Sequence, residues 1–497
     1  MRSQTRPLQA EADSTMDRRL SGVRARGPLL LLLPVLLLSV LHVRALDNGL
    51  MLLPPMGWNT WCAFGPCGTD VCTERQVLDS IAAMKSNGMA TAGYEWITLD
   101  DCYAMRRDNA TGELFPDPAL FPNGFDRVVA AAHAANFKFG IYTSAGNYTC
   151  HAKKENCSGT CNVGSLGHYE QDAATFARWQ LDYVKMDWCS ASVRALDCRT
   201  QYALMARALN RTGRPMALYM SCGGHDSTEA WPPTVSNVWR IGFDHLDCWT
   251  DGPCTAQDRS KGHGTKQAIA YLAGRGAQQA PGGWGTPDFL KTGGKSCAVN
   301  ATPGPGALCP TQTAEEYRTE LTMWSMASAP LLVSSDIRAL TPLQRELLLN
   351  REVLGIDQQP VGGDCSGAPG RHCGRDTGGV QQVWTKPLAE TAFAATRGWG
   401  ALRNHTAVAL VNLGDTAAEP IAAANLTQIL GLAGGAGSGG AGGGAVRVRV
   451  RDVWRQAECP GPDCPATLRL ACDAARDCTL TDTVPAHGTR LFRVWLG

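Results

Sequence analysis

Six aspartates occupy positions from which their carboxyl groups could act together on one substrate. Each follows or lies near a short apolar run, and they are Asp100, Asp101, Asp187, Asp244, Asp288 and Asp336. A single aspartate after a strand is most often the N-cap of the next helix. A ring of six carries a cost in mutual repulsion that a purely structural set need not bear. Paired carboxylates are what cleavage of a glycosidic bond needs, one to attack the sugar carbon and one to protonate the leaving oxygen.

Tryptophans lie on or beside the same apolar runs and offer flat faces on which sugar rings could stack. They are Trp58, Trp61, Trp188, Trp239 and Trp284. For each one taken singly, packing in the core is the commoner use of a tryptophan. Together with the acids, they favour a carbohydrate as the substrate.

The elements that must position these residues alternate between two patterns from residue 55 to about residue 340. Strands are expected at Met56 to Thr60, Tyr94 to Asp100, Phe137 to Ser144, Leu181 to Asp187, Met216 to Cys222, Val238 to Asp244, Trp284 to Phe289 and Leu331 to Asp336. Helices between them are expected at Glu74 to Ser86, Phe125 to Ala135, Gln171 to Gln180 and Ala314 to Ala327.

Strands separated by helices predict βαβ units and a parallel sheet. Eight repeats over roughly 280 to 300 residues are the size of a (β/α)8 TIM barrel, in which catalytic groups lie at the C-terminal ends of the strands. An open doubly wound sheet is the alternative, but no G-x-G-x-x-G follows the first strand.

After about residue 360 the pattern changes to strands without intervening helices, which predicts an antiparallel β-sandwich. These strands are expected at Val380 to Thr385, Ala407 to Asn412, Val446 to Trp454, Thr467 to Leu470 and Thr489 to Trp495. The Gly/Ala tract from Ala433 to Ala445 is expected to be a loop between two of them. The predicted organisation is a signal peptide at 1–45, a barrel at 46–358 and an antiparallel β domain at 359–497.

The N-terminus has the form of a secretory signal peptide. Arginines precede an apolar run from Leu29 to Val43 that contains Pro34. This run is shorter than the roughly 20 residues of a membrane-spanning helix, so we expect cleavage and no permanent membrane anchor. Basic and acidic residues are balanced, 46 against 45, and basic residues form no cluster beyond the N-terminus, so no nucleic-acid partner is expected.

All 20 cysteines lie at or after Cys62, which together with a secretion signal favours disulfides. The spacings of Cys157 with Cys161 and of Cys459 with Cys464 would also suit zinc, but histidines at finger spacing are absent, so no metal is expected. Sequons for N-glycosylation occur at Asn109, Asn147, Asn156, Asn210, Asn300, Asn404 and Asn425. These features predict a glycoprotein of the secretory pathway.

Several motifs follow one another in a fixed order from Leu46 to about Pro360. They are Leu46-Asp47-Asn48-Gly49-Leu50, Pro55-Met56-Gly57-Trp58-Asn59-Thr60-Trp61, Leu99-Asp100-Asp101-Cys102, Gly140-Ile141-Tyr142, Tyr183-Val184-Lys185-Met186-Asp187, Trp239-Arg240 with Asp244, and Ala329-Pro330-Leu331-Leu332 with Asp336. In this order they resemble the α-galactosidases and α-N-acetylgalactosaminidases of glycoside hydrolase family 27. The resemblance implies a barrel followed by an antiparallel β domain, retention of anomeric configuration, no cofactor, and a lysosomal, vacuolar or secreted location. It also implies a galactose-terminated carbohydrate as substrate and is compatible with a homodimer.

The resemblance assigns roles to individual residues. Asp187 matches the nucleophile and Asp244 the general acid/base. Sugar-binding positions are matched by Trp61, Asp100, Asp101, Tyr142, Lys185, Cys222, Arg240 and Asp288. Lys185, two residues before Asp187 on a strand, projects to the same side and can hold that carboxylate ionised.

The resemblance also bears on the disulfides. Cys150 and Cys189 match a family disulfide. Cys102 matches a bridged position, for which both Cys62 and Cys67 are plausible partners.

The sequence departs from the family where the 2-position of the sugar is recognised. After Cys222 stands Gly223, in place of the usual Glu, Ser or Ala, and the insertion from Gly293 to Pro310 is unfamiliar. Because glycine removes a contact and frees volume, α-galactosidase activity is expected with side activity on α-N-acetylgalactosaminides.

Other functions remain open on this scaffold. They are an α-N-acetylgalactosaminidase, a β-L-arabinopyranosidase and an inactive carbohydrate-binding protein. Intact Asp187, Asp244 and Lys185 favour an enzyme over a binding protein.

Overall fold

A computed structural model describes most of the chain beyond residue 47. The described residues are 48–64, 71–103, 105–151, 162–222, 231–250, 262–292, 312–360, 379–389, 405–417, 424–430, 448–472 and 478–497. All of them belong to one compact unit, Val43–Gly497. The expected signal peptide, Gly223, the insertion from Gly293 to Pro310 and the Gly/Ala tract lie outside the described residues and stay predictions.

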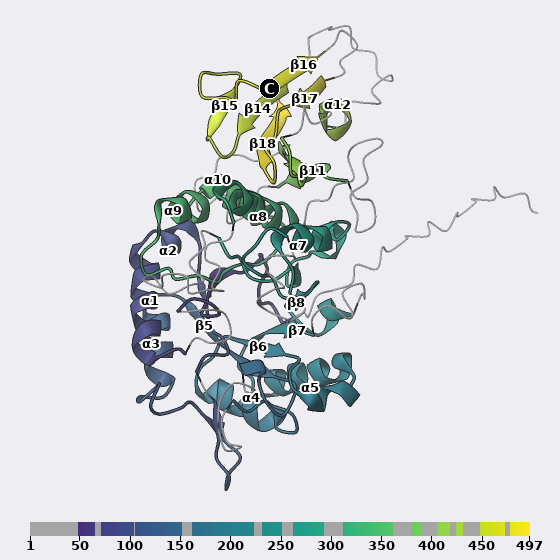
Figure 1. The fold of residues 1–497 in the computed structure, drawn as a ribbon. Helices are drawn as coiled ribbons and strands as arrows, with labels where there is room; N and C mark the ends of the chain where they lie inside the picture. Colours follow the sequence, from purple (N-terminus) through teal and green to yellow (C-terminus); the bar gives the residue numbers. More distant parts are fainter. Residues whose placement is uncertain are drawn as a thin grey trace, which may run out of the picture. The chain divides into compact units, whose positions relative to one another are not determined.

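The first part of the chain forms an eight-stranded parallel sheet that curls around an axis (Figure 1). Its strands pair in the order β10-β1-β2-β5-β6-β7-β8-β9. An isolated parallel bridge between Leu290 and Val333 joins the segment after β9 to β10 at the two ends of this order. The expected barrel is confirmed, since a doubly wound sheet would reverse its strand order. The strands are β1 (Met56–Asn59), β2 (Trp96–Leu99), β5 (Lys138–Ser144), β6 (Tyr183–Asp187), β7 (Ala217–Ser221), β8 (Val238–Arg240), β9 (Trp284–Thr286) and β10 (Leu331–Val333).

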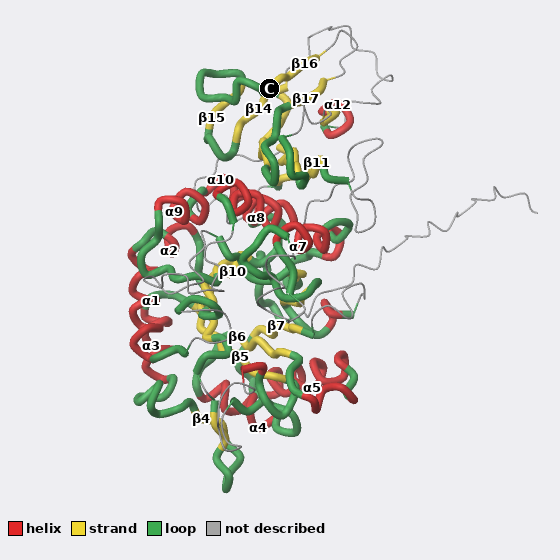
Figure 2. Tube along the Cα trace, in the orientation of Figure 1, coloured by secondary structure: helices red, strands yellow, loops and turns green. Residues whose placement is uncertain are grey.

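Helices cover the outside of this sheet, and Figure 2 shows them as the red segments around the yellow strands. The expected helices at Glu74–Ser86 and Ala314–Ala327 are confirmed at both ends. Thr73 and Thr313 each begin the helix with a reciprocal capping box. The helices are α1 (Glu74–Ser86), α2 (Met89–Ala92), α3 (Asp126–Ala134), α4 (Tyr169–Arg178), α5 (Cys198–Arg211), α7 (Thr265–Leu272), α8 (Ala314–Ala327), α9 (Pro342–Leu348) and α10 (Arg351–Asp357). A short hairpin of β3 (Arg106–Arg107) and β4 (Leu114–Phe115) lies between β2 and α3.

The barrel strands are all shorter than the sequence predicts, and β8, β9 and β10 end well before their expected last residues. β8 ends at Arg240, where its pairing with Thr286 of β9 ends, so Asp244 lies in the following loop and not on the strand. β10 ends at Val333, and Asp336 lies beyond it. The expected ranges were too long because an apolar run can continue into a buried loop after strand pairing has ended.

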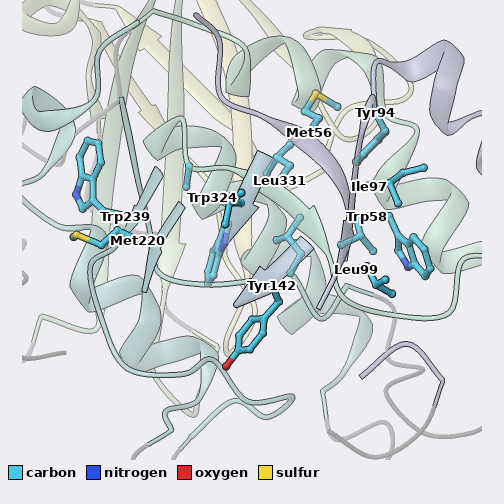
Figure 3. Packing of buried hydrophobic residues seen from close by; sticks show 14 of the residues in the cluster. Met56, Trp58, Tyr94, Ile97, Leu99, Tyr142, Met220, Trp239, Trp324 and Leu331 are labelled. Carbon is cyan, nitrogen blue, oxygen red and sulfur yellow. The ribbon is translucent and has the colours of Figure 1, made fainter. Parts of the chain in front are cut away.

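The core consists of one layer between the strands and the helices and a smaller cluster inside the barrel. In Figure 3, side chains from β1, β2 and β10 pack in the same region as Trp324 of α8. Trp58 and Trp284 are fully buried and Trp239 nearly so, which makes these three tryptophans core residues and not platforms for sugar rings. Trp61 and Trp188 are only partly buried.

The C-terminal part forms two antiparallel sheets, ordered β11-β12-β18-β14-β15 and β13-β17-β16. Apolar side chains from both sheets form one cluster, so the expected β-sandwich is confirmed. Its elements are β11 (Gln381–Leu388), β12 (His405–Asn412), β13 (Ala424–Asn425), α12 (Leu426–Ile429), β14 (Val448–Asp452), β15 (Ala457–Cys459), β16 (Arg469–Cys472), β17 (Cys478–Thr481) and β18 (Thr489–Leu496).

A buried lysine of the sandwich contacts the ends of two barrel helices. Lys386 of β11 is fully buried, and its Nζ donates to Ser325 O at 2.8 Å and Ser328 Oγ at 2.6 Å, and also to Ile356 O. Burial lowers the pKa of Lys386 to about 7 and raises that of the neighbouring Asp357 well above its usual value.

Among the residues described, no helix combines the length and the apolar character needed to cross a bilayer.

Candidate active site

Asp187 is the last residue of β6, so its carboxyl group lies at the C-terminal end of the barrel strands. Its Oδ1 accepts from the backbone N–H of Trp188 at 2.8 Å, and its Oδ2 accepts from the hydroxyl of Tyr142 at 3.0 Å. Tyr142 lies on the adjacent strand β5, paired with Lys185. Two donors therefore hold this carboxylate in one orientation.

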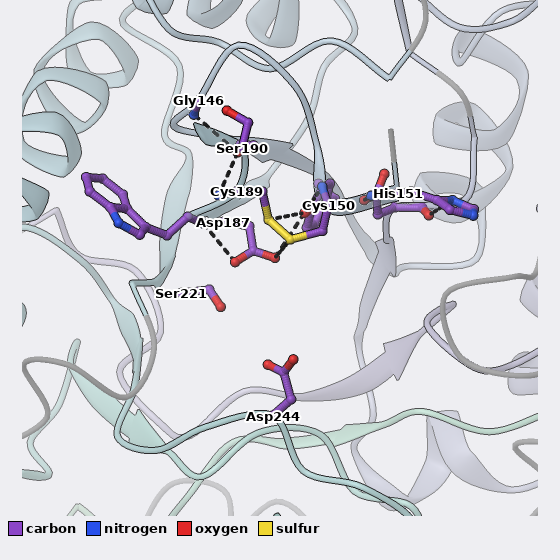
Figure 4. The surroundings of a disulfide bond; sticks show 12 residues. Gly146, Cys150, His151, Asp187, Cys189, Ser190, Ser221 and Asp244 are labelled. Atoms are coloured by element: carbon purple, nitrogen blue, oxygen red, sulfur yellow. Dashed lines mark hydrogen bonds between the residues drawn. A yellow bond between two sulfur atoms is a disulfide. The ribbon is translucent and has the colours of Figure 1, made fainter. Parts of the chain in front are cut away.

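A disulfide closes one side of the Asp187 carboxylate, and the expected pairing of Cys150 with Cys189 is confirmed. Cys150 Sγ lies 3.8 Å from Asp187 Oδ2 (Figure 4). The bond ties the segment after β5 to the segment after β6. Because both sulfurs belong to this disulfide, the cluster of Cys150, Asp187 and Cys189 offers a metal ion one carboxylate and no thiolate.

Lys185 forms its direct ion pair with Asp100, not with Asp187 as the strand spacing suggested. Its Nζ lies 2.9 Å from Asp100 Oδ2, and it also lies 4.6 Å from the ring centre of Phe289. The side chain of Asn59 donates to the same Asp100 oxygen at 2.7 Å. The charge of Lys185 still acts on Asp187, since it is the largest influence lowering the pKa of that carboxyl.

Asp101 is buried directly beside Asp100. The backbone N–H of His151 donates to Asp101 Oδ2 at 2.8 Å. Burial is the main cause that raises the pKa of Asp101 to about 7, and the charges of Asp100 and Asp187 raise it further. A carboxyl group with this pKa can donate as well as accept near neutral pH.

Asp244 lies in the loop after β8 and has an exposed side chain (67%), whereas that of its partner Arg240 is 3% exposed. Arg240 Nη2 donates to Asp244 Oδ1 at 3.1 Å, and its Nη1 lies 3.4 Å from Asp288 Oδ2. Asp288 Oδ2 also accepts from the backbone N–H of His245 at 3.0 Å. Although burial opposes it, Arg240 and Lys291 hold the pKa of Asp288 below its usual value. Asp288 therefore contacts both Arg240 and the backbone of the loop that carries Asp244.

The carboxyl groups of Asp187 and Asp244 face each other across the site (Figure 4). Burial raises the pKa of Asp187, and the charge of Asp244 raises it further, while Lys185 opposes both. One acid is thus enclosed and held by two donors, and the other is exposed and held by one arginine. Opposed environments of this kind are how two carboxyl groups take different roles in one reaction.

Three further residues were expected at the site, and they are Trp61, Cys222 and Asp336. Trp61 is half-buried near Asp100, and its backbone N–H donates to Asn59 Oδ1 at 2.7 Å. Cys222, directly after β7, is bonded to Cys198 of α5. Both oxygens of Asp336 bind the guanidinium of Arg338, at 3.0 and 2.8 Å.

The expected partners of Cys102 are wrong. Cys102 is bonded to Cys72, just before α1, and Cys62 is engaged in a disulfide of its own. The spacing C-x4-C of Cys459 and Cys464 is a disulfide and not part of a zinc site.

Several residues that contact the site were missed, among them Asn59 and His151. Asn59 ends β1 and binds Asp100, and the rule that found the aspartates, a polar residue where a barrel strand ends, would also have found it. His151 has no such signal, because it lies in the segment after β5 and acts through its backbone.

A (β/α)8 barrel with two opposed carboxylates beyond the C-terminal ends of its strands has the groups that a glycoside hydrolase needs to cleave a glycosidic bond. Residues 53–359 match the family described as alpha galactosidase A, and residues 378–494 match its C-terminal beta sandwich domain. The chain belongs to the α-galactosidase family, so the resemblance stated from the motifs is confirmed.

Individual relatives agree with this assignment. The α-galactosidase of Cyamopsis tetragonoloba is 35% identical over 349 residues, which are 70% of this chain and 73% of that protein. The crystal structure of α-galactosidase I from Mortierella vinacea has a TM-score of 0.67 at 28% identity and covers 90% of this chain and 98% of its own. The structure of an α-galactosidase from Saccharomyces cerevisiae with raffinose has a TM-score of 0.66 at 25% identity, over 90% of this chain and 99% of that one.

Proposed function

We propose that the chain is a retaining exo-α-galactosidase that removes terminal α-galactosyl residues by double displacement. Asp187 is the nucleophile and Asp244 the general acid/base. The observation that carries the proposal is the opposed placement of these two carboxyl groups in unlike surroundings. The names of the relatives support the galactosyl substrate.

In the first step, an oxygen of Asp187 attacks the anomeric carbon while Asp244 gives its proton to the leaving oxygen. The bond to the leaving group breaks and a covalent galactosyl-enzyme forms. In the second step, Asp244 takes a proton from water, the water oxygen attacks the same carbon, and Asp187 leaves as a carboxylate. The donors from Trp188 and Tyr142 stabilise the anionic form of Asp187 at the start and end of this cycle.

The sugar lies, in this proposal, among the polar groups that surround Asp187. Asp100 and Asp101 offer adjacent carboxyl oxygens, and Lys185 and Arg240 offer donors. Selectivity at the 2-position depends on Gly223, outside the described residues, and the side activity on N-acetyl sugars stays a prediction. We also propose a secretory-pathway location, which the disulfides support.

The stereochemistry of the first product tests the mechanism. NMR spectra recorded during hydrolysis of 4-nitrophenyl α-galactoside should show the α-anomer of galactose before mutarotation produces the β-anomer. A β-anomer that appears first would refute Asp187 as nucleophile, because inversion uses a water in its place.

Two substitutions separate the roles. Asp187→Gly should abolish hydrolysis, and added azide should restore transfer of the sugar to azide in the vacated space. Asp244→Gly should keep its reactivity toward substrates with good leaving groups, which need little protonation. Equal loss on every substrate without rescue, in two folded variants, would remove the support for distinct roles.

A further inference from the structure

The loop that carries Asp244 is held by contacts along its length. The backbone N–H of His245 donates to Asp288, as described above. Further along, Asp247 Oδ1 accepts from the hydroxyl of Tyr317 on α8 at 2.7 Å. The loop that carries Asp244 is therefore held by Asp288 and by helix α8.

Trp249 lies beyond these contacts on the same loop and is 5% exposed. Its indole N–H has no hydrogen-bond partner among the described residues, so none of them fixes the plane of the ring by a hydrogen bond to it. The ring of His487, from the sandwich, is stacked on it with 4.6 Å between ring centres and 22° between planes. Trp249 thus receives its orientation in part from the C-terminal domain.

His487 is itself firmly held. Its Nδ1 lies 2.6 Å from Glu316 Oε1, its Nε2 lies 2.9 Å from Asp415 Oδ1, and its carbonyl oxygen accepts from Thr319 at 2.7 Å. Carboxylate oxygens only accept, so both contacts are hydrogen bonds at once when the ring carries both protons. Helix α8 carries both Glu316 and Tyr317, so one helix supports two of the loop contacts.

From these contacts we infer that His487 is a positioning residue for Asp244, acting through the ring of Trp249. The inference rests on the proposed role of Asp244 as acid/base. A general acid must lie within hydrogen-bond reach of the leaving oxygen, and a displacement of about 1 Å can cost on the order of 100-fold in rate. The sandwich thereby helps to position the proton donor although none of its described residues lies among the site residues.

The substitution that tests this inference is His487→Gly. Residue 487 has φ +56°, a conformation that glycine adopts without strain, so the change removes the ring. Asparagine is avoided because, before Gly488 and Thr489, it would create a sequon for N-glycosylation. The matched control is His405→Asn, because His405 also stacks on a tryptophan of the sandwich, Trp495, at 4.4 Å and 11°.

The readout is kcat/KM for methyl α-galactoside, a poor leaving group, and for 4-nitrophenyl α-galactoside, a good one. His487→Gly should lower the first by about 10-fold and the second by less than about 3-fold, within the roughly 100- to 10,000-fold contribution of a general acid. His405→Asn should change neither by more than about 2-fold. Equal losses on both substrates, or none on either, would overturn the inference.

A second variant, Glu316→Gln, keeps helix α8 intact because glutamine also serves at this position of a capping box. It replaces the carboxylate that holds His487 and should give a smaller loss with the same dependence on the leaving group. Asp244→Asn is the reference. If its loss does not depend on the leaving group, the acid/base assignment fails and the inference fails with it. If its loss does depend on the leaving group but those of the His487 and Glu316 variants do not, the inference alone fails.

Discussion

The hydroxyl of Tyr142 should set the acid limb of the pH profile. Tyr142→Phe removes the 3.0 Å hydrogen bond to Asp187 Oδ2 and keeps the buried ring, which also lies 5.0 Å from Lys185 Nζ. A hydrogen bond to a charged group contributes about 1.5–3 kcal/mol. At about 1.4 kcal/mol per pKa unit, its loss raises the pKa of Asp187 by about 1–2 units.

The sign of the effect follows from the role of the carboxylate. The nucleophile must be ionised, and burial already raises the pKa of Asp187 above its usual value. Removing a donor raises this pKa further, so the acid limb of kcat/KM should move to higher pH by about 1–2 units. The assay measures kcat/KM for 4-nitrophenyl α-galactoside from about pH 3 to pH 8, with reactions stopped in carbonate.

The control is Tyr169→Phe, which removes a buried hydroxyl that bonds Ala145 O and Gln201 and does not touch Asp187. Its acid limb should coincide with that of the unsubstituted enzyme. An unmoved limb in Tyr142→Phe, or one moved to lower pH, would refute the reasoning that the hydroxyl stabilises the anionic nucleophile.

Two further predictions concern stability. Burial raises the pKa of Glu320 to about 8, so the protonated folded state is favoured at low pH and this stability is lost as pH rises through about 8. The unfolding temperature of the unsubstituted protein should therefore fall as the pH rises from about 5 to about 8.5, and that of Glu320→Gln should fall less. An equal fall in the two proteins would contradict this prediction. Replacing both Cys150 and Cys189 with serine opens a loop with a sequence separation of 39 and should cost about 4 kcal/mol of unfolding free energy as well as activity. The same change at Cys459 and Cys464, separated by 5, should cost about 2 kcal/mol and leave activity unchanged, so similar activities of the two double variants would count against a role of the first disulfide at Asp187.

Rules that use only neighbouring residues in the sequence found the site residues that lie at the ends of strands. Asp187 ends β6 and Asp100 follows β2, so the barrel rule that places chemistry at strand ends located them. The starts of α1 and α8 are also marked in the sequence, by the capping boxes that begin at Thr73 and Thr313.

Features that depend on the third dimension were not readable in this way. Strand spacing places Lys185 on the side of Asp187 but cannot show that Asp100, on another strand, lies closer to its ammonium group. The pairing of Cys102 with Cys72 depends on how α1 begins beside the end of β2. Burial of Trp58 and Trp284 depends on packing between elements, which a strand pattern shared with Trp61 does not reveal.

Lys386 has a consequence for how the protein is made. Its ammonium group satisfies carbonyl oxygens at the ends of α8 and α10, yet it follows both helices in the chain. During synthesis the barrel segments leave the ribosome first, so these carbonyl oxygens lack their donor until residue 386 has emerged. A nascent chain stopped near residue 360 would therefore carry the ends of α8 and α10 without the contacts that β11 supplies.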